Sequence, residues 1–512
     1  MHPVGHLPAA AMPQAVFGVR WDGRGRALVL AVGVAVSLFA ALLFAQASAA
    51  RERSVHVVVM GDHSVKDSKR AVRAAGGSVE HVLRIVNGVV ARVPAGSLAS
   101  LERAPGVRGV ALDRRFSTRS DDLPEAEPDT TEVLSPDAGP DDDVGLSLSE
   151  LRGTIGASRL DSTGSGVDIA LIDSGISPVA GLAGAGKVVN GADFSDDRSH
   201  HELRNLDAYG HGTHLAGIIA GQDEASGFTG VAPGSRLINV KVAEAEGTTS
   251  LIQLMLAIDW VVRNRTANGM NIRVLTLAVG DDNRHGYLRE PLAWAVEQAW
   301  SAGIVVVTAA GNDGNTHRGL NLPAADPYVI AVGGVDGKRT ADPADDEIAD
   351  WSSRGNRMRD PDFAAPGEAI VSLRVPGSFL DERYPAARVG NGRFRGSGTS
   401  QAAAVATGAV ALLLSRHPSW NPDAVKAALR GGARSLGADH RAQGEGSLDV
   451  VAADATSPTG AVQAWPRARS LSMRELVRRG RDDINVWDGR RWSGRRWSGL
   501  EWTGVRWNGV KW

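Results

Sequence analysis

Five short apolar runs recur between residues 153 and 455: VDIALID, RLINVKV, IRVLTLAV, GIVVVTAA and YVIAVGGV. Each run is apolar on both faces of an extended chain, and stretches with helical periodicity separate the runs. Strands that are buried on both faces and joined by helices are typical of a parallel sheet covered by helices on its two sides. The sequence therefore predicts an α/β fold, with a mainly parallel sheet flanked by helices, over residues 153–455.

A second folded unit is expected ahead of this region. From Ser54, the strand pattern SVHVVVM, the helical pattern KDSKRAVRAAGG and further strand and helix patterns alternate up to Phe116. The 512-residue chain is also longer than one hydrophobic core normally organises. We therefore expect a small α+β domain over residues 54–116.

Composition excludes several classes of function. The chain has no cysteine, which removes disulfides, thiolate metal sites and cysteine nucleophiles. Its formal net charge is −2, which argues against a protein that binds nucleic acid over its whole surface.

The N-terminal residues 1–50 have the pattern of an export signal. Arginines precede an uncharged apolar run at 27–44, and the small residues AQASAA follow at 45–50. The run has 18 residues, which is also the lower limit for spanning a bilayer, so an uncleaved membrane anchor is the alternative. Both interpretations place the chain after residue 50 outside the cytoplasm, as a secreted or anchored extracytoplasmic protein.

Three segments have the composition of linkers or tails. Residues 117–150 are rich in Asp, Glu and Pro, which predicts a disordered acidic linker. Residues 456–486 are a basic linker, and residues 487–512 repeat Trp every fifth position with a turn-forming glycine pair after each of the first five. A loosely packed tail and a contact with cell-wall polymer or polysaccharide are both compatible with this repeat, whereas nucleic acid is less favoured.

Three residues at the ends of predicted elements suggest nucleophilic catalysis. Asp173 ends the run VDIALID, His211 begins an apolar helical pattern in DAYGHGTHLAG, and Ser400 lies between glycines and a long helical pattern. A serine hydroxyl becomes nucleophilic when an imidazole takes its proton, and the imidazole needs a carboxylate to fix its tautomer. We therefore assign Ser400, His211 and Asp173 to these catalytic roles.

The predicted helix after Ser400 also suggests an oxyanion site. Backbone N–H groups at a helix N-terminus favour a developing negative charge, so the N–H of Ser400 is one expected donor. Asn312, in the loop after GIVVVTAA, is the candidate for a second donor. An ordinary turn asparagine is the alternative interpretation of Asn312.

Other interpretations of these residues are less favoured. His211 and His214 are three residues apart, as metal ligands can be, but no carboxylate pattern completes a zinc site, so no metal ligand is assigned. We expect His214 to be a packed or hydrogen-bonded histidine. No G-x-S-x-G motif surrounds Ser400, which argues against an α/β-hydrolase, a lipase or an esterase.

Six blocks resemble those of the subtilisin-like serine proteases, in the same order: ALIDSGI, YGHGTHLAGIIAG, GVAPGSRLINVKV, VVTAAGNDG, DFAAPGEAIVS and GTSQAAAVATGAVALLL. The resemblance covers residues 153–455. It implies the subtilisin-like fold, peptide-bond hydrolysis through an acyl-enzyme, the triad Asp173, His211 and Ser400, and Asn312 as a side-chain oxyanion donor.

The resemblance has further implications for partners. Residues 54–116 are similar to the family's inhibitory propeptides, which implies a ferredoxin-like α+β propeptide as a partner of the catalytic domain. Polypeptide substrates would bind as an added β-strand, at a position that reads Ala278, Val279 and Gly280 in this chain.

The chain departs from the family pattern at several positions. Gln401 follows the expected nucleophile where the family usually has Met, and Ala278 and Val279 replace the usual Ser and Leu. The loop 222–230 has the length of the family's calcium loop, but no matching carboxylate follows Asp173, so structural calcium is open and no cofactor is required for the chemistry.

The leading hypothesis is an exported serine endopeptidase made as a self-processed zymogen. The alternative hypothesis is a surface-retained binding protein on a protease fold, which uses the Trp-rich tail to hold a polymer or a partner.

Overall fold

The computed structural model describes residues 54–116, 145–280, 286–315, 319–340, 342–356, 358–458 and 460–468. The predicted export signal at 1–50, most of the acidic linker and the Trp repeat at 487–512 lie outside these ranges. By their contacts, residues 55–93 and 97–512 form one compact unit, and residues 1–54 with 94–96 form another. No helix within the described ranges is long and apolar enough to cross a membrane.

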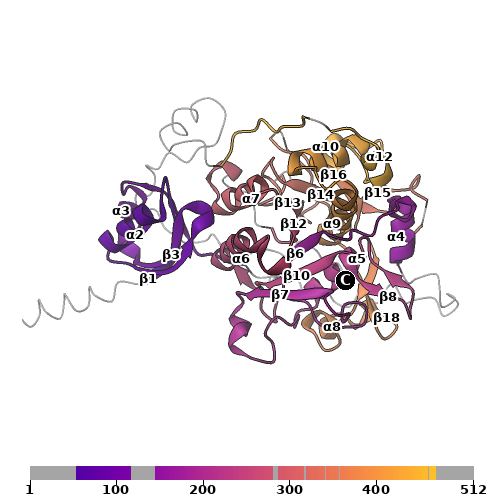
Figure 1. The fold of residues 1–512 in the computed structure, drawn as a ribbon, viewed down its shortest axis with the longest axis horizontal. Coiled ribbons are helices and arrows are strands. Elements are labelled where there is room, and N and C mark those ends of the chain that lie inside the picture. The colour runs from indigo at the N-terminus through magenta and orange to yellow at the C-terminus, as the bar shows by residue number, and fades with distance from the viewer. Residues whose placement is uncertain are drawn as a thin grey trace, which may run out of the picture. The chain divides into compact units, whose positions relative to one another are not determined.

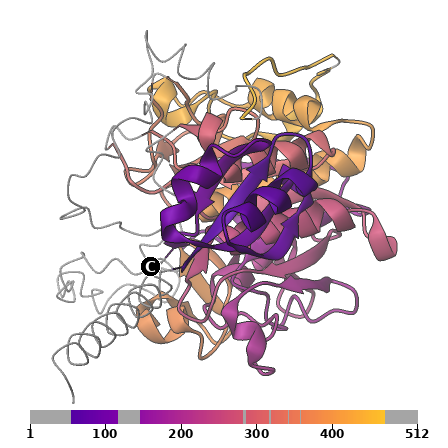
Figure 2. The ribbon, with the colours of Figure 1, turned by 90° about the vertical axis from the view of Figure 1, so that its left-hand side faces the viewer.

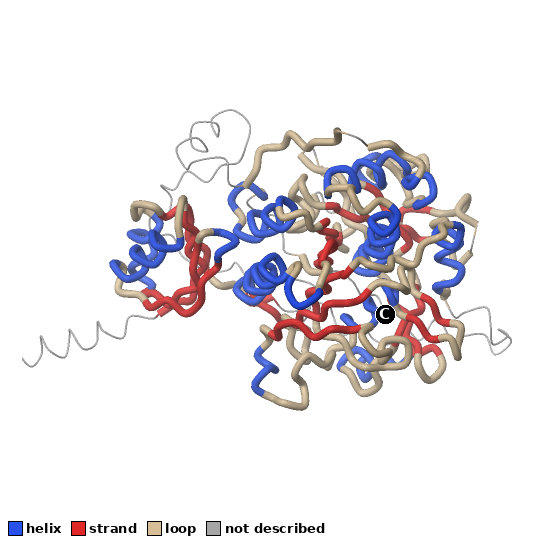
Figure 3. Tube along the Cα trace, viewed as in Figure 1, coloured by secondary structure: helices blue, strands red, loops and turns tan. Residues whose placement is uncertain are grey.

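Residues 54–116 form the expected α+β arrangement. The elements are β1 (Ser54–Gly61), α2 (Val65–Ala74), β2 (Ser78–Leu83), β3 (Gly88–Pro94), α3 (Leu98–Glu102) and β4 (Val107–Leu112), followed by the short strand β5 (Arg115–Phe116). The four main strands lie in the order β2-β3-β1-β4, which with two helices is the ferredoxin-like βαββαβ topology. Both helices lie on one face of the sheet (Figure 2, Figure 3), where they share an apolar cluster with Val57, Val59 and Val89.

Residues 145–468 contain the larger sheet and most of the helices (Figure 1). The strands are β6 (Asp168–Asp173), β7 (Val188–Asp193), β8 (Gln222–Asp223), β9 (Phe228–Thr229), β10 (Arg236–Lys241), β11 (Thr249–Ser250), β12 (Ile272–Leu277), β13 (Val305–Ala309), β14 (Ile330–Asp336), β15 (Glu347–Ile348), β16 (Phe363–Pro366), β17 (Ile370–Leu373), β18 (Arg388–Val389) and β19 (Arg393–Gly396). The helices are α4 (Leu148–Thr154), α5 (His211–Ala220), α6 (Leu251–Asn264), α7 (Pro291–Ser301), α8 (Phe379–Arg383), α9 (Thr399–Arg416), α10 (Pro422–Gly432), α11 (His440–Gln443) and α12 (Val450–Asp454).

The central sheet is mainly parallel, as the apolar runs predict. Its strands lie in the order β15-β14-β13-β12-β6-β10-β7, with β16 also paired to β14, and among these pairs β14–β15 is antiparallel. All six residues of β6 are buried, because helices α5 and α9 cover one face of the sheet and α6 and α7 cover the other (Figure 1). This burial on both faces accounts for the continuous apolar runs in the sequence.

The predicted boundary between linker and catalytic domain is wrong by several residues. Helix α4 begins at Leu148, inside the expected linker 117–150 and before the expected domain start at 153. Ser147 and Glu150 form a capping box at its N-terminus, and Leu148 and Leu151 are buried in the main core. The acidic composition of the segment hides this S-x-x-E helix start.

The start of the predicted basic linker 456–486 also packs against the fold. The hydroxyls of Tyr328 and Tyr287 donate to the carbonyls of Trp465 and Pro466, at 2.8 Å each. Ala468 is 6% exposed, and its N–H donates to Glu297 at 2.6 Å. Residues 463–468, which we call the C-terminal strap, are therefore part of the folded structure.

Candidate active site

Asp173 and His211 meet at one edge of the central sheet. Asp173 is the last residue of β6, and His211 is the first residue of α5. The imidazole Nδ1 lies 2.9 Å and 3.0 Å from the two carboxylate oxygens, and both side chains are at most 1% exposed. A carboxylate at Nδ1 keeps the proton on that nitrogen and leaves Nε2 as the basic atom.

Two residues that the sequence analysis did not single out hold this pair. The backbone N–H of Ser174 donates to Asp173 Oδ1 at 2.7 Å, and the Ser174 hydroxyl donates to Asp207 Oδ1 at 2.8 Å. Asp207 also accepts the backbone N–H groups of Gly210 and Thr213 at the start of α5, at 2.6 Å and 2.7 Å. Ser174 and Asp207 occur within the blocks ALIDSGI and DAYGHGTHLAG, but no spacing in the sequence indicates that they meet.

Ser400 is the second residue of α9, at the N-terminus of the longest helix in the described ranges. Gly398 precedes the helix with φ of 152°, a conformation that side chains rarely adopt. The Ser400 hydroxyl is buried and donates to the carbonyl of Ala278 at 3.4 Å. The expected nucleophile thus lies at a helix N-terminus, beside the segment that follows β12.

Asn312 lies in the loop after β13, with its amide held by Thr399. Its Oδ1 accepts the backbone N–H and the hydroxyl of Thr399, at 2.9 Å each. Because a backbone N–H is always a donor, this contact identifies the facing atom as oxygen and the other amide atom as nitrogen. That nitrogen is buried and has no hydrogen-bond partner among the described residues. Asn312 therefore has a fixed, available N–H donor one residue from Ser400's neighbour, which an ordinary turn asparagine does not need.

Residues 278–280, the position of the expected substrate strand, follow β12 directly. Ala278 and Val279 are at most 1% exposed, and the Ala278 carbonyl is the acceptor for Ser400. The Thr276 and Thr407 hydroxyls, 2.8 Å apart, fasten β12 to α9. The structure thus brings this segment next to Ser400.

His214 is packed within α5, as expected. Its Nε2 lies 3.0 Å from the Phe394 carbonyl. Burial, with a smaller contribution from the neighbouring His211, lowers the pKa of His214 to about 3. The ring is therefore neutral at physiological pH and adds no charge beside His211.

Gln401 follows Ser400 and is fully buried. Neither atom of its amide has a hydrogen-bond partner among the described residues. A polar side chain thus stands directly after the expected nucleophile, where the family pattern has an apolar one.

The described residues give little support for a metal site. They contain no group of three or more His, Cys, Asp or Glu side chains that could hold a metal ion. The loop 222–230 forms the hairpin β8–β9, and Asp223 lies 3.8 Å from Arg393, which supplies positive charge there. The residues of this loop do not fit a calcium site, and no catalytic step is assigned to a metal.

Comparison with known proteins agrees with this arrangement. Residues 164–446, more than half of the chain, match the model of the subtilase family, Peptidase_S8. Serine protease AprX of Bacillus subtilis is 38% identical over 278 residues, which are 53% of this chain and 62% of AprX. Subtilisin DY of Bacillus licheniformis is 33% identical over 292 residues, which are 57% of this chain and 91% of that protein.

A solved structure supports the fold. The crystal structure of fervidolysin from Fervidobacterium pennivorans, described as a keratinolytic enzyme related to subtilisin, superimposes with a TM-score of 0.59. The sequence identity is 23%, and the match covers 80% of this chain and 62% of fervidolysin. The likeness extends beyond the family-matched residues 164–446.

Proposed function

The chain belongs to the subtilase family, and on this premise we propose that it is an exported serine endopeptidase made as a self-processed zymogen. Asp173, His211 and Ser400 are its catalytic triad. The reaction is hydrolysis of a peptide bond in a polypeptide, through an acyl-enzyme on Ser400.

The contact between Asp173 and His211 carries this proposal. The carboxylate lies within 3.0 Å of Nδ1 through both of its oxygens, in a site where neither side chain is more than 1% exposed. In this role His211 takes the Ser400 proton through Nε2 and later gives it to the leaving amine. Asp173 stabilises the imidazolium that forms between these two steps.

The oxyanion of the tetrahedral intermediate would be held by two donors. One is the backbone N–H of Ser400 at the N-terminus of α9, and the other is Asn312 Nδ2. The Thr399 contacts hold the Asn312 amide in place before the substrate arrives. A donor that is already oriented needs no reorganisation as charge develops.

Substrate would bind along residues 278–280 as an added strand, through backbone hydrogen bonds. Contacts of residues 54–116 suggest how a propeptide uses the same mode of binding. The Ile85 N–H donates to Asp259 on α6 at 2.9 Å, and Arg114 pairs with Glu290 ahead of α7 at 2.8 Å. Strand β5 then runs antiparallel to β11, so the chain leaves the propeptide in the extended conformation that a protease requires.

The decisive experiment compares Ser400→Ala with Ser415→Ala in the full-length chain. Ser415 lies at the other end of the same helix, where its hydroxyl donates to the Ser165 carbonyl, so it is a matched control. We expect Ser400→Ala to abolish casein hydrolysis and cleavage between propeptide and catalytic domain, and Ser415→Ala to retain both. N-terminal sequencing of the secreted protein reports self-processing and removal of the export signal together. Casein hydrolysis or self-processing by Ser400→Ala would refute the assignment.

The Trp repeat at 487–512 lies outside the described residues, and attachment to cell-wall polymer or polysaccharide remains a prediction for it. The described part of the chain favours the enzyme over a pure binding role, because its buried polar groups converge on Ser400 and His211.

A further inference from the structure

Asp207 is a buried carboxylate that contacts both halves of the Asp173–His211 arrangement. It is 1% exposed and lies in the loop that leads into α5. One oxygen accepts the Ser174 hydroxyl and the Gly210 N–H, and the other accepts the Thr213 N–H. Asp207 therefore links the residue after Asp173 to the first turn of the helix that carries His211.

The hydrogen bonds around Asp207 fit an ionised carboxylate. Three donors point at its two oxygens, and a protonated carboxyl would have to direct its own proton among them. Burial raises the pKa of Asp207, and the bonds from Gly210, Thr213 and Ser174 lower it. A buried charge is costly unless it is fully hydrogen-bonded, whereas a neutral cap such as Ser or Asn would hold a helix N-terminus more cheaply.

Ser174 connects the two carboxylates. Its Oγ lies 2.8 Å from Asp207 Oδ1 and 3.1 Å from Asp173 Oδ1, and it accepts the Gly212 N–H at 3.0 Å. A hydroxyl has one proton, so its direction depends on the charge of both acids. The negative charge of Asp207 is thus one side chain away from Asp173 and His211.

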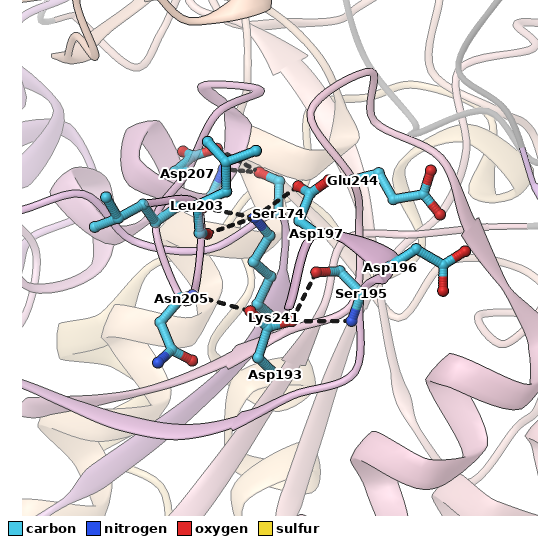
Figure 4. A network of polar contacts seen from close by, with 12 residues as sticks. Ser174, Asp193, Ser195, Asp196, Asp197, Leu203, Asn205, Asp207, Lys241 and Glu244 are labelled. Carbon is cyan, nitrogen blue, oxygen red and sulfur yellow. Dashed lines mark hydrogen bonds and ion pairs between the residues drawn. The ribbon is translucent and has the colours of Figure 1, made fainter. Parts of the chain in front are cut away.

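Lys241 fastens the loop that presents Asp207 (Figure 4). The ammonium group is fully buried at the end of β10, where Lys241 pairs in register with Asp173 of β6. Its three N–H bonds are matched by Asp197 Oδ2 at 2.9 Å, Leu203 O at 3.1 Å and Leu206 O at 2.8 Å. Because Leu206 precedes Asp207, the position of Asp207 is tied to the strand edge that carries Asp173.

We propose that Asp207 is a positioning residue for the catalytic pair: through Ser174 and the first turn of α5 it fixes the contact between Asp173 and His211, and its charge favours the imidazolium. The inference rests on the proposed triad. Other charged or titratable groups on the surrounding elements are Asp173 on β6, His211 and His214 on α5, Lys241 with Asp197, and Asp381 on α8 with its partners Arg374 and Arg388.

The test compares Asp207→Asn with Asp193→Asn in the full chain. Asp193 belongs to the same network (Figure 4) and accepts bonds from Ser195 and Asn205, but it has no printed contact with Ser174 or α5. Hydrolysis of a small chromogenic peptide is followed from acidic to alkaline pH, with active sites counted by a serine-directed organophosphate. We expect Asp207→Asn to lower kcat by roughly tenfold or more at nearly unchanged KM, because misplacement of a catalytic group slows chemistry more than binding.

The pH profile separates positioning from mere stability. Loss of a nearby negative charge lowers the pKa of an imidazolium, so the acidic limb of kcat/KM should move to lower pH in Asp207→Asn and stay in place in Asp193→Asn. An unchanged limb and unchanged kcat per active site in Asp207→Asn would overturn the inference, even if the melting temperature falls.

A double-mutant cycle with Ser174→Ala covers poor folding of Asp207→Asn alone. If Asp207 acts through Ser174, its substitution should cost several-fold less in kcat when Ser174 is already Ala. Strictly additive effects would contradict the shared-hydroxyl mechanism. Failure of the proposed function itself is distinct, since it would appear as activity in Ser400→Ala.

Discussion

Glu297 and Asp326 form a buried pair of carboxyl groups whose protonation should control stability. Both side chains are fully buried. Burial, and then the charge of Asp326, raises the pKa of Glu297, and burial raises the pKa of Asp326. Glu297 also accepts the Ala468 N–H at 2.6 Å, so the pair lies where the C-terminal strap meets α7.

The sign of the pH effect follows from these directions. In the unfolded chain both acids lose their protons in the ordinary carboxyl range, whereas the folded protein keeps protons to higher pH. The stabilising contribution is therefore fully present at acidic pH and is lost as pH rises through the raised folded pKa. One extra bound proton lowers the free energy of unfolding by about 1.4 kcal/mol per pH unit, so two units cost about 2.7 kcal/mol.

Glu297→Gln should remove most of this dependence. The Gln carbonyl can still accept the Ala468 N–H, while its NH₂ supplies a permanent donor to the Asp326 carboxylate. We expect the free energy of unfolding at mildly alkaline pH to rise by about 2 kcal/mol and the melting temperature to rise by a few degrees. At acidic pH the variant and its parent should differ little.

The assay is thermal unfolding of both proteins across acidic to alkaline pH, in a Ser400→Ala background to prevent autolysis. Glu224→Gln is the matched control, because Glu224 is an exposed residue with no resolved pKa shift. The reasoning is refuted if Glu297→Gln and its parent lose stability in parallel as pH rises, or if the control shows the same change.

Three further predictions concern catalysis, calcium and the tail. Asn312→Leu should lower kcat by ~10²–10³ at similar KM, a figure that is the one known for subtilisin itself, a member of this family, rather than one derived from the distances; equal losses in KM and none in kcat would exclude the oxyanion role. Calcium or a chelator should leave the melting temperature unchanged if no structural site exists, and a calcium-dependent increase would show that one does. Deletion of 485–512 should release the protein from the cell surface if the Trp repeat attaches it, and unchanged retention would exclude attachment.

Much of the fold could be predicted because burial leaves a strong pattern. The runs around β6, β10, β12 and β13 are apolar on both faces, so their strands and the parallel sheet follow from the sequence. Boundaries were less predictable, as α4 shows, because a four-residue capping box is a weak signal within an acidic stretch. The packing of residues 463–468 was not predicted either, since its contacts are mostly made by backbone atoms.

The candidate site divides in the same way. Asp173, His211, Ser400 and Asn312 could be selected because each stands at the end of a predicted element, where an open α/β sheet exposes its reactive groups. Their ordered blocks also identify the family. By itself, the sequence determined which residue types were available and which elements would carry them.

Only the tertiary structure decided how these residues are supported. Asp207 meets Ser174 from 33 positions away, and Lys241 reaches the loop carbonyl of Leu206 from 35 positions away. Such contacts depend on strand order and on the path of a loop, and their polar partners have no periodicity that a sequence pattern could reveal. A hydrogen bond requires atoms within about 3 Å, and that distance is set by the assembled sheet rather than by any local stretch of chain.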